Sequence, residues 1–244
     1  MTAPTALLTP WYRRLSASPG GRADLMGSVE PTAILDHRSP AIRQLVVSAQ
    51  GASTSADALA VLEAAHGLIR DRVRPVYALE EATPASRTLT RASGSCSQRL
   101  AILESVARSL GVATRARALL IDRSFWYPRF PRLRYVLPDQ VLLVWPEFHV
   151  DGSWLSAAEL FGPIGCRAGG AFTNQGAETL FEAVGRCAVD WDGGGADSSY
   201  DLSPYVGADL GYFTDRDRAF SHVGQTLCAP SRFLADPILR RIAV

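Results

Sequence analysis

The stretch GSCSQRLAILESVARSLGVATR, residues 94–115, decides the fold because it predicts a buried helix that begins at a cysteine. Its apolar residues recur at helical spacing, and Gly111 follows them as a C-terminal cap. The apolar positions are Leu100, Leu103, Val106, Ala107 and Leu110. Cys96 therefore lies in the first turn of the predicted helix. Unpaired backbone N–H groups and the helix dipole at that place are expected to lower its pKa and favour a thiolate.

Two amphipathic helices are predicted before this stretch, one opening at Ser39-Pro40 and one running from Ser55 to Val73. The segment from Glu80 to Gly94 is polar and turn-rich, so it is expected to be a loop that leads into Ser95-Cys96. The sequence thus predicts helices, then a loop, then the cysteine helix.

Strands are predicted after the cysteine helix. Residues 112–121 have strand character, and residues 141–150 form a hairpin with Trp154-Leu155 around the Asp151-Gly152 turn. Side chains 139, 141, 143, 145, 147 and 149 are expected to share one face of the sheet. The predicted class is α+β, in which the N-terminal helices and the cysteine helix pack on an antiparallel sheet.

The last third of the chain is rich in glycine, aspartate and aromatic residues. We expect a core over residues 1–161 and a C-terminal extension over 162–244 that packs on it. Within the extension, residues 178–184 and 215–220 are helical candidates, and residues 201–218 are otherwise expected to be irregular.

Composition excludes several classes of function. The chain has 244 residues, is 47% hydrophobic and 20% charged, and carries a net charge of +1 with scattered basic residues, so nucleic acid is not an expected partner. All 25 basic residues are arginine, which excludes lysine chemistry. No run of about 18 apolar residues occurs, so no membrane span is predicted and the protein is expected to be cytoplasmic. The four cysteines form no CxxC and have no histidine at metal-ligand spacing. They are expected to be free thiols, and neither a metal nor another cofactor is predicted.

Several motifs together resemble the core of the transglutaminase-like, or papain-like thiol, superfamily over about residues 36–160. They are VRPVY at 73–77, ASRTL at 85–89, GSC at 94–96, LGVATR at 110–115, and Trp145, Glu147, Val150-Asp151-Gly152 and Trp154. The resemblance implies a Cys-His-Asp triad with Cys96 as nucleophile. The sequence departs from that pattern, because the family histidine falls on Leu143 and the family aspartate on or beside Ala158, with Glu159 adjacent.

Other residues must therefore move the proton. Asp122, at a strand end, and Asp139, on the face of Leu143, are the candidate bases. Asp122 has a structural alternative as a loop-capping residue, and Asp139 lies about 13 Å along the strand from Leu143 unless a bulge or a shifted register brings it closer. His149 lies roughly 20 Å along the strand from Leu143, too far for the same thiol. His66 is expected to be structural, and His222 reaches the site only if the extension is a lid.

An aromatic stretch, residues 125–130, follows Asp122. It either fills core space or, with Trp145, lines an apolar acyl pocket in which Trp126 and Tyr127 contact substrate. Both interpretations remain open from the sequence.

A thioester donor suits a site without imidazole, because a thiolate leaving group needs no general acid. The resemblance then favours the carrier-protein off-loading enzymes, above all the tetramate-forming Dieckmann cyclases. The predicted partner is a carrier protein with a phosphopantetheine-linked acyl chain. The alternatives are an amide-forming acyltransferase and a catalytically silent binding module, while a peptidase is weakened by Leu143.

Overall fold

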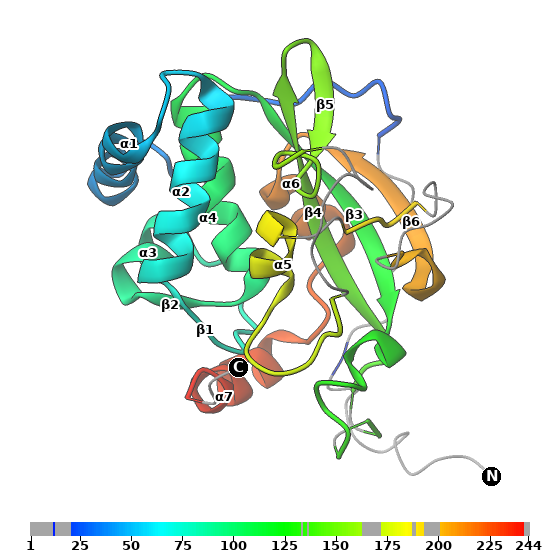
Figure 1. The fold of residues 1–244 in the computed structure, drawn as a ribbon. Helices are drawn as coiled ribbons and strands as arrows, with labels where there is room; N and C mark the ends of the chain where they lie inside the picture. Colours follow the sequence, from blue (N-terminus) through cyan, green and yellow to red (C-terminus); the bar gives the residue numbers. More distant parts are fainter. Residues whose placement is uncertain are drawn as a thin grey trace, which may run out of the picture.

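A computed structural model describes Tyr12 and residues 21–132, 134–135, 137–162, 172–186, 189–192 and 201–241 of the chain. The described part contains a helical half and a four-stranded sheet, which lie beside each other in Figure 1. The mixed architecture confirms the predicted α+β class.

The helical half surrounds the cysteine helix. It consists of α1 (Pro40–Ala52), α2 (Ala58–Arg72), α3 (Ala85–Arg91) and α4 (Cys96–Ser109). Helix α4 lies in the centre, with every residue from Ser97 to Arg108 buried, and contacts α1, α2 and α3. Helix α1 begins as predicted, because the Ser39 hydroxyl accepts the Ile42 N–H as an N-cap. Helix α3 is a correction, since a loop was expected there; its buried Ala85 and Thr88 pack it onto α4.

The sheet has the strand order β5-β4-β3-β6 and is antiparallel throughout. Its strands are β3 (Thr114–Asp122), β4 (Gln140–Val150), β5 (Ser153–Ser156) and β6 (Val206–Phe213). The β4–β5 hairpin turns at Asp151 and Gly152, whose φ angles are 50° and 79°, as the Asp-Gly pair predicted. Strand β6 is a second correction, because residues 201–218 were expected to be irregular. The C-terminal third therefore supplies an edge strand of the central sheet.

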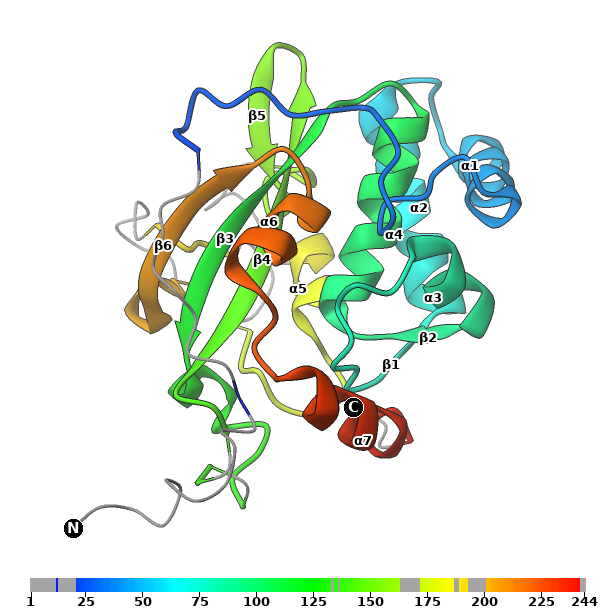
Figure 2. The same ribbon diagram turned by 180° about the vertical axis from the view of Figure 1, so that it is seen from behind.

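Helices cover both faces of the sheet. Leu119, Leu143 and Trp145 point into the main core with α4, whereas Leu120 and Val144 pack toward α6 (Arg216–Val223) on the opposite face. Figure 2 shows α6 in front of β3 and β4.

The register of β4 against β3 and β5 is unbroken, which agrees with the predicted alternation of faces along the strand. Beyond Trp145 the contacts of these side chains change: Phe148 and Val150 join the same core cluster as Leu143, whereas Glu147 forms a buried ion pair with Arg115 at 2.7 Å.

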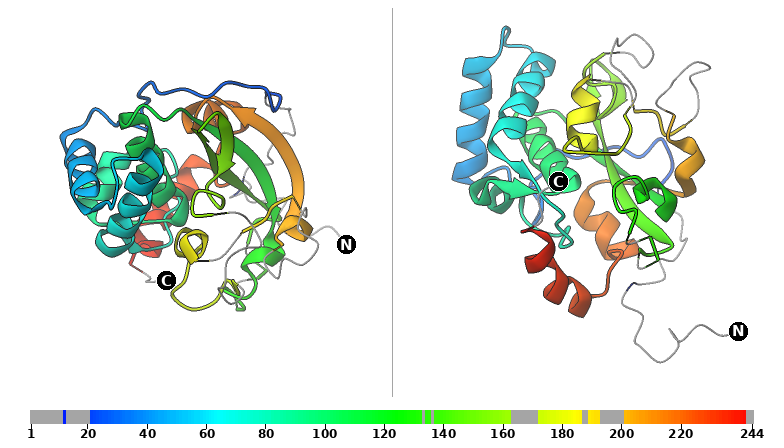
Figure 3. Two further views of the ribbon diagram at one scale, coloured as in Figure 1. Left: turned by 45° about the horizontal axis from the view of Figure 1, so that its top comes forward. Right: turned by 60° about the horizontal axis from the view of Figure 1, so that its bottom comes forward.

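The remaining elements frame the start of α4. Short parallel strands β1 (Arg74–Pro75) and β2 (Ser93–Gly94) pair immediately before it. Helix α5 (Leu180–Arg186) packs on α2 and α4, close to the predicted 178–184. Helix α6 begins after the Asp215 N-cap, as predicted, and α7 (Ala229–Leu239) lies at the end of the molecule near β1 (Figure 3). The 3-10 helices η2 (Arg123–Trp126) and η3 (Ser203–Tyr205) complete the order.

Candidate functional site

The backbone around Cys96 is fixed by local contacts. The Ser95 hydroxyl accepts the Gln98 N–H, and the Gln98 side chain accepts the Ser95 N–H, which together form a capping box. Gly94 is required, since a Cβ there would lie 2.5 Å from the Thr88 methyl group. Cys96 is therefore the first residue of α4, as predicted.

Cys96 opens into a mostly apolar pocket of about 420 Å³. Beside the start of α4, five parts of the chain form its walls: the segment after β1, the stretch after β3, the start of β4, residues 174–180 and the C-terminal segment. The apolar walls include Val76, Trp126, Phe130, Leu137, Val141, Leu142, Leu143, Leu180, Leu227, Ala235 and Leu239. Leu143, which the sequence resemblance aligns with a histidine, lines the same pocket as Cys96. The pocket is the concave apolar shape that a hydrophobic ligand needs.

The thiol of Cys96 is not activated at rest. Burial raises its pKa to about 11, and the carboxylates of Glu81 and Glu182 add to the rise against the opposing charges of Arg99 and Arg129. The expectation of a lowered pKa is therefore wrong, because the helix start is enclosed by apolar walls and faces two acidic residues. A neutral thiol at this position needs a base before it can attack a carbonyl.

Glu81 is the carboxylate that lies in the pocket with Cys96. Burial raises its pKa above the ordinary glutamate value, although hydrogen bonding to Ser97 and the charge of Arg216 oppose the rise. Its Oε1 lies 3.5 Å from the Ser95 hydroxyl. A carboxyl with a raised pKa that lines the same pocket as a thiol is a suitable proton acceptor and donor.

Sequence reasoning missed Glu81. It lies in the polar segment before the cysteine helix, and the adjacent acids Glu80 and Glu81 carry no periodic pattern that would mark either one. The available signal was a carboxylate pair in the segment that leads to the nucleophile.

The two predicted bases lie outside the pocket. The carboxylate of Asp122 caps η2 and accepts hydrogen bonds from the N–H and hydroxyl of Ser124. Asp139 pairs with Arg123 at 2.8 Å, and its side chain is 69% exposed. Neither residue lines the pocket that contains Cys96. The geometry therefore favours a capping role for Asp122 and a surface ion pair for Asp139.

The three predicted substrate-binding residues have different environments. Trp126 lines the pocket. Tyr127 follows η2 and is not among the lining residues. Trp145 is buried in the core, where its ring packs edge-on against Trp191 at 5.7 Å.

No histidine among the described residues lines this pocket. His66 is buried and its Nε2 lies 2.6 Å from the Phe181 carbonyl oxygen, a structural contact. His149 packs on Trp154 and His222 packs on Phe213. Ala158, where the family aspartate was aligned, is fully buried.

Arg129 supplies the polar edge of the pocket. Its Nε donates to the side-chain oxygen Oδ1 of Asn174 at 3.1 Å, and its Nη1 donates to the backbone carbonyl of Gly176 at 3.0 Å. Both Arg129 and Asn174 line the pocket. Most of their hydrogen-bonding groups are engaged within the protein, because Arg129 also donates to the Glu178 carbonyl and Asn174 donates to the Phe125 carbonyl.

A second thiol is described at the N-terminus of α7. Cys228 is free, and a hydrogen bond with Ser231 lowers its pKa. Cys166 and Cys187 lie outside the described residues. Within the described ranges, no group of three acidic, histidine or cysteine side chains is placed to hold a metal ion.

Comparison with protein-family models, with curated proteins and with solved structures gave no match. Among the helices of the described residues, none has both the length and the apolar character required to cross a membrane.

Proposed function

We propose that this protein transfers an acyl group from a carrier-protein thioester to Cys96 and releases it by cyclisation. One observation carries the proposal: Cys96, Glu81 and Leu143 line a single, mostly apolar pocket that is lined by no histidine of the described residues. The sequence resemblance to transglutaminase-like enzymes supports Cys96 as the nucleophile.

In the first step, Glu81 accepts the Cys96 proton as the sulfur attacks the thioester carbonyl. Backbone N–H groups at the start of α4 stabilise the oxyanion. Collapse breaks the bond to the phosphopantetheine sulfur, which leaves as a thiolate and takes the proton from Glu81. One thioester is exchanged for another, and no external acid is consumed.

In the second step, the carbon between the two carbonyls of a β-ketoacyl-aminoacyl chain gives its proton to Glu81. The carbanion attacks the Cys96 thioester carbonyl, forming a C–C bond and closing the ring. The C–S bond breaks, and the Cys96 sulfur regains the proton from Glu81. A buried carboxylate with a raised pKa is a stronger base than an exposed one, which suits this acidic carbon.

The pocket supports an apolar acyl chain as substrate. Its walls are aliphatic and aromatic, whereas Arg129 and Asn174 provide polar groups at one edge. In this proposal the chain lies along Trp126 and the β4 side chains, and the polar head is held near Arg129.

The test is acylation of Cys96 by a β-ketoacyl-aminoacyl N-acetylcysteamine thioester, followed by mass spectrometry of the Cys96 peptide. Both Cys96→Ala and Glu81→Gln are expected to abolish or strongly slow release of the cyclised product. Cys228→Ser is the matched control, since it removes the other described thiol outside the proposed chemistry. Undiminished off-loading by Cys96→Ala would refute the mechanism.

Two other functions have observations in their favour. An amide-forming acyltransferase would use the same Cys96 thioester, and supplying amine acceptors distinguishes it by yielding amide in place of the ring. A catalytically silent binding module is favoured by the raised pKa of Cys96. In that case the thioester would bind without any acyl adduct forming on Cys96.

A further inference from the structure

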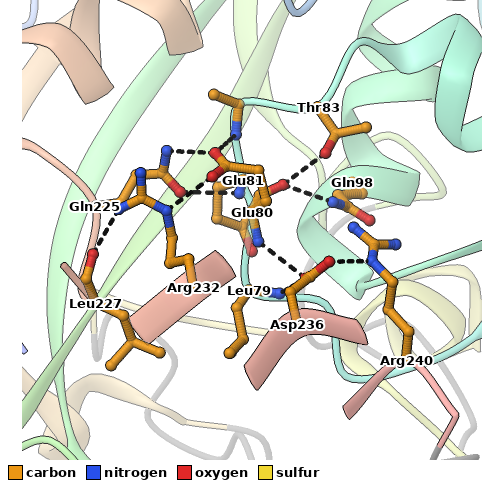
Figure 4. A network of polar contacts seen from close by, with 11 residues as sticks. Leu79, Glu80, Glu81, Thr83, Gln98, Gln225, Leu227, Arg232, Asp236 and Arg240 are labelled. Atoms are coloured by element: carbon orange, nitrogen blue, oxygen red, sulfur yellow. Dashed lines mark hydrogen bonds and ion pairs between the residues drawn. The ribbon is translucent and has the colours of Figure 1, made fainter. Parts of the chain in front are cut away.

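The segment that carries Glu81 is held by side chains from the far end of the chain. The Asp236 Oδ1 accepts the N–H groups of Leu79 and Glu80 at 2.6 and 3.2 Å. The Gln225 Oε1 accepts the N–H of Glu81 at 2.9 Å. Three consecutive backbone donors are thus satisfied by two residues of the C-terminal segment, as Figure 4 shows.

Glu80 strengthens the same attachment. Its carboxylate accepts hydrogen bonds from Gln225 Nε2 at 2.7 Å and from Arg232 Nε at 2.9 Å. Burial alone would raise the pKa of Glu80, but these partners lower it below its ordinary value. The Glu80 carboxylate therefore remains charged and bound to the C-terminal segment at neutral pH.

The attachment continues into the start of the cysteine helix. The Glu80 carbonyl accepts the Gln98 Nε2–H at 2.8 Å, and Gln98 belongs to the capping box of Ser95. Glu80 is engaged by the C-terminal segment, while its neighbour Glu81 lines the pocket with Cys96. One network therefore connects Gln98 at the start of α4, the Glu80-Glu81 segment and the C-terminal segment (Figure 4).

Apolar packing alone does not hold α7 in place. None of its residues is buried, and Phe233, Leu234 and Ile238 are 65–81% exposed. Its polar contacts with Leu79 and Glu80 thus help to fix its position. Through Ala235 and Leu239 the same helix forms one wall of the pocket.

We propose that Gln225 and Asp236 are positioning residues that hold Glu81 against Cys96 through the backbone of residues 79–81. This inference rests on the proposed role of Glu81 as the base. Without the two acceptors, the N–H groups of residues 79–81 hydrogen-bond to water instead. Glu81 then leaves the orientation in which it can accept the thiol proton.

The test compares acylation rates of Cys96, measured with the N-acetylcysteamine thioester in a Cys228→Ser background. Asp236→Ala and Gln225→Ala are expected to lower the rate by about tenfold or more, within the range attributed to a general base. Asp236→Asn keeps an oxygen acceptor and is expected to stay within about threefold of the parent. Asp71→Ala, which removes an exposed aspartate on α2, is the control.

Epistasis separates positioning from a merely structural effect. In a Glu81→Gln background, Asp236→Ala and Gln225→Ala are expected to change the acylation rate by less than about twofold, because the group they position is gone. A loss that persists undiminished in that background would overturn the proposal, as would parent-like rates for both alanine variants. If those rates stay parent-like while Glu81→Gln is slow, positioning alone fails; if Glu81→Gln is itself unimpaired, the proposed base fails.

Discussion

Replacing Glu81 by glutamine is expected to change two rates at Cys96 in opposite directions. The side chain keeps its size, but loses the negative charge that raises the pKa of the thiol. Alkylation by a small electrophile depends on the thiolate fraction and should become faster. Acyl transfer from a thioester depends on removal of the thiol proton and should become slower.

The size of the first effect follows from the pKa. With a pKa of about 11 in place of the ordinary 9.0, roughly one Cys96 in a thousand is a thiolate at pH 8, against roughly one in ten without the shift. Each unit by which the pKa falls gives about ten times more thiolate, whose nucleophilicity is about threefold lower. The net gain is about threefold per unit, and at most about tenfold, since burial and Glu182 still act.

The second effect is larger. A general base contributes about a hundredfold to ten-thousandfold to the rate, so acylation of Cys96 is expected to fall by about a hundredfold or more. Asp139→Asn is the matched control, because its exposed carboxylate lies outside the pocket and should leave both rates unchanged.

The assay measures iodoacetamide alkylation of the Cys96 peptide by mass spectrometry from pH 7 to 11, in a Cys228→Ser background. That background matters because the lowered pKa of Cys228 makes it the faster thiol. A Glu81→Gln variant with an unchanged alkylation profile would show that the two groups do not interact. Slowing of both reactions would indicate damage to the pocket instead of loss of a base.

Three further predictions use the same geometry. Leu143→His places an imidazole in the pocket and is expected to speed alkylation of Cys96 at pH 7 by about tenfold or more, with no gain for Gln140→His, which places an imidazole at an exposed position of β4 outside the pocket. Arg216→Met leaves the buried Glu104 carboxylate unpaired and should lower the free energy of unfolding by about 3–5 kcal/mol, measured by urea denaturation. Burial acts to raise the pKa of Asp236, but hydrogen bonds from Arg240 and from the Leu79 and Glu80 N–H groups outweigh it and lower the pKa below 3.8. Its stabilisation is therefore full above pH 3.8 and is lost as pH falls through the lower folded value, where exchange of the Leu79 amide should accelerate in the parent but not in Asp236→Asn.

Local patterns predicted much of the fold. The apolar periodicity of α4, the Ser39-Pro40 start of α1 and the Asp-Gly turn of the hairpin all depend on neighbours within a few residues. Helix α3 and strand β6 were missed because their segments are polar or irregular in pattern. Both depend on partners far along the chain: Asp36 accepts the Ser86 N–H at the start of α3, and β6 pairs with β3.

The candidate site divides in the same way. Its cysteine could be identified from the sequence, because a helix start is a local property. The proposed base could not be identified, because Asp122 and Asp139 were chosen by their position along strands that follow Cys96. The carboxylate that lines the pocket is Glu81, which precedes Cys96 in the sequence.

The sequence by itself determined that Cys96 begins a buried helix. Only the tertiary structure decided that the thiol is neutral at rest and that Glu81 shares its pocket. The physical reason is that a pKa depends on burial and on nearby charges, and both are set by segments distant in sequence, including the C-terminal residues that hold Glu81.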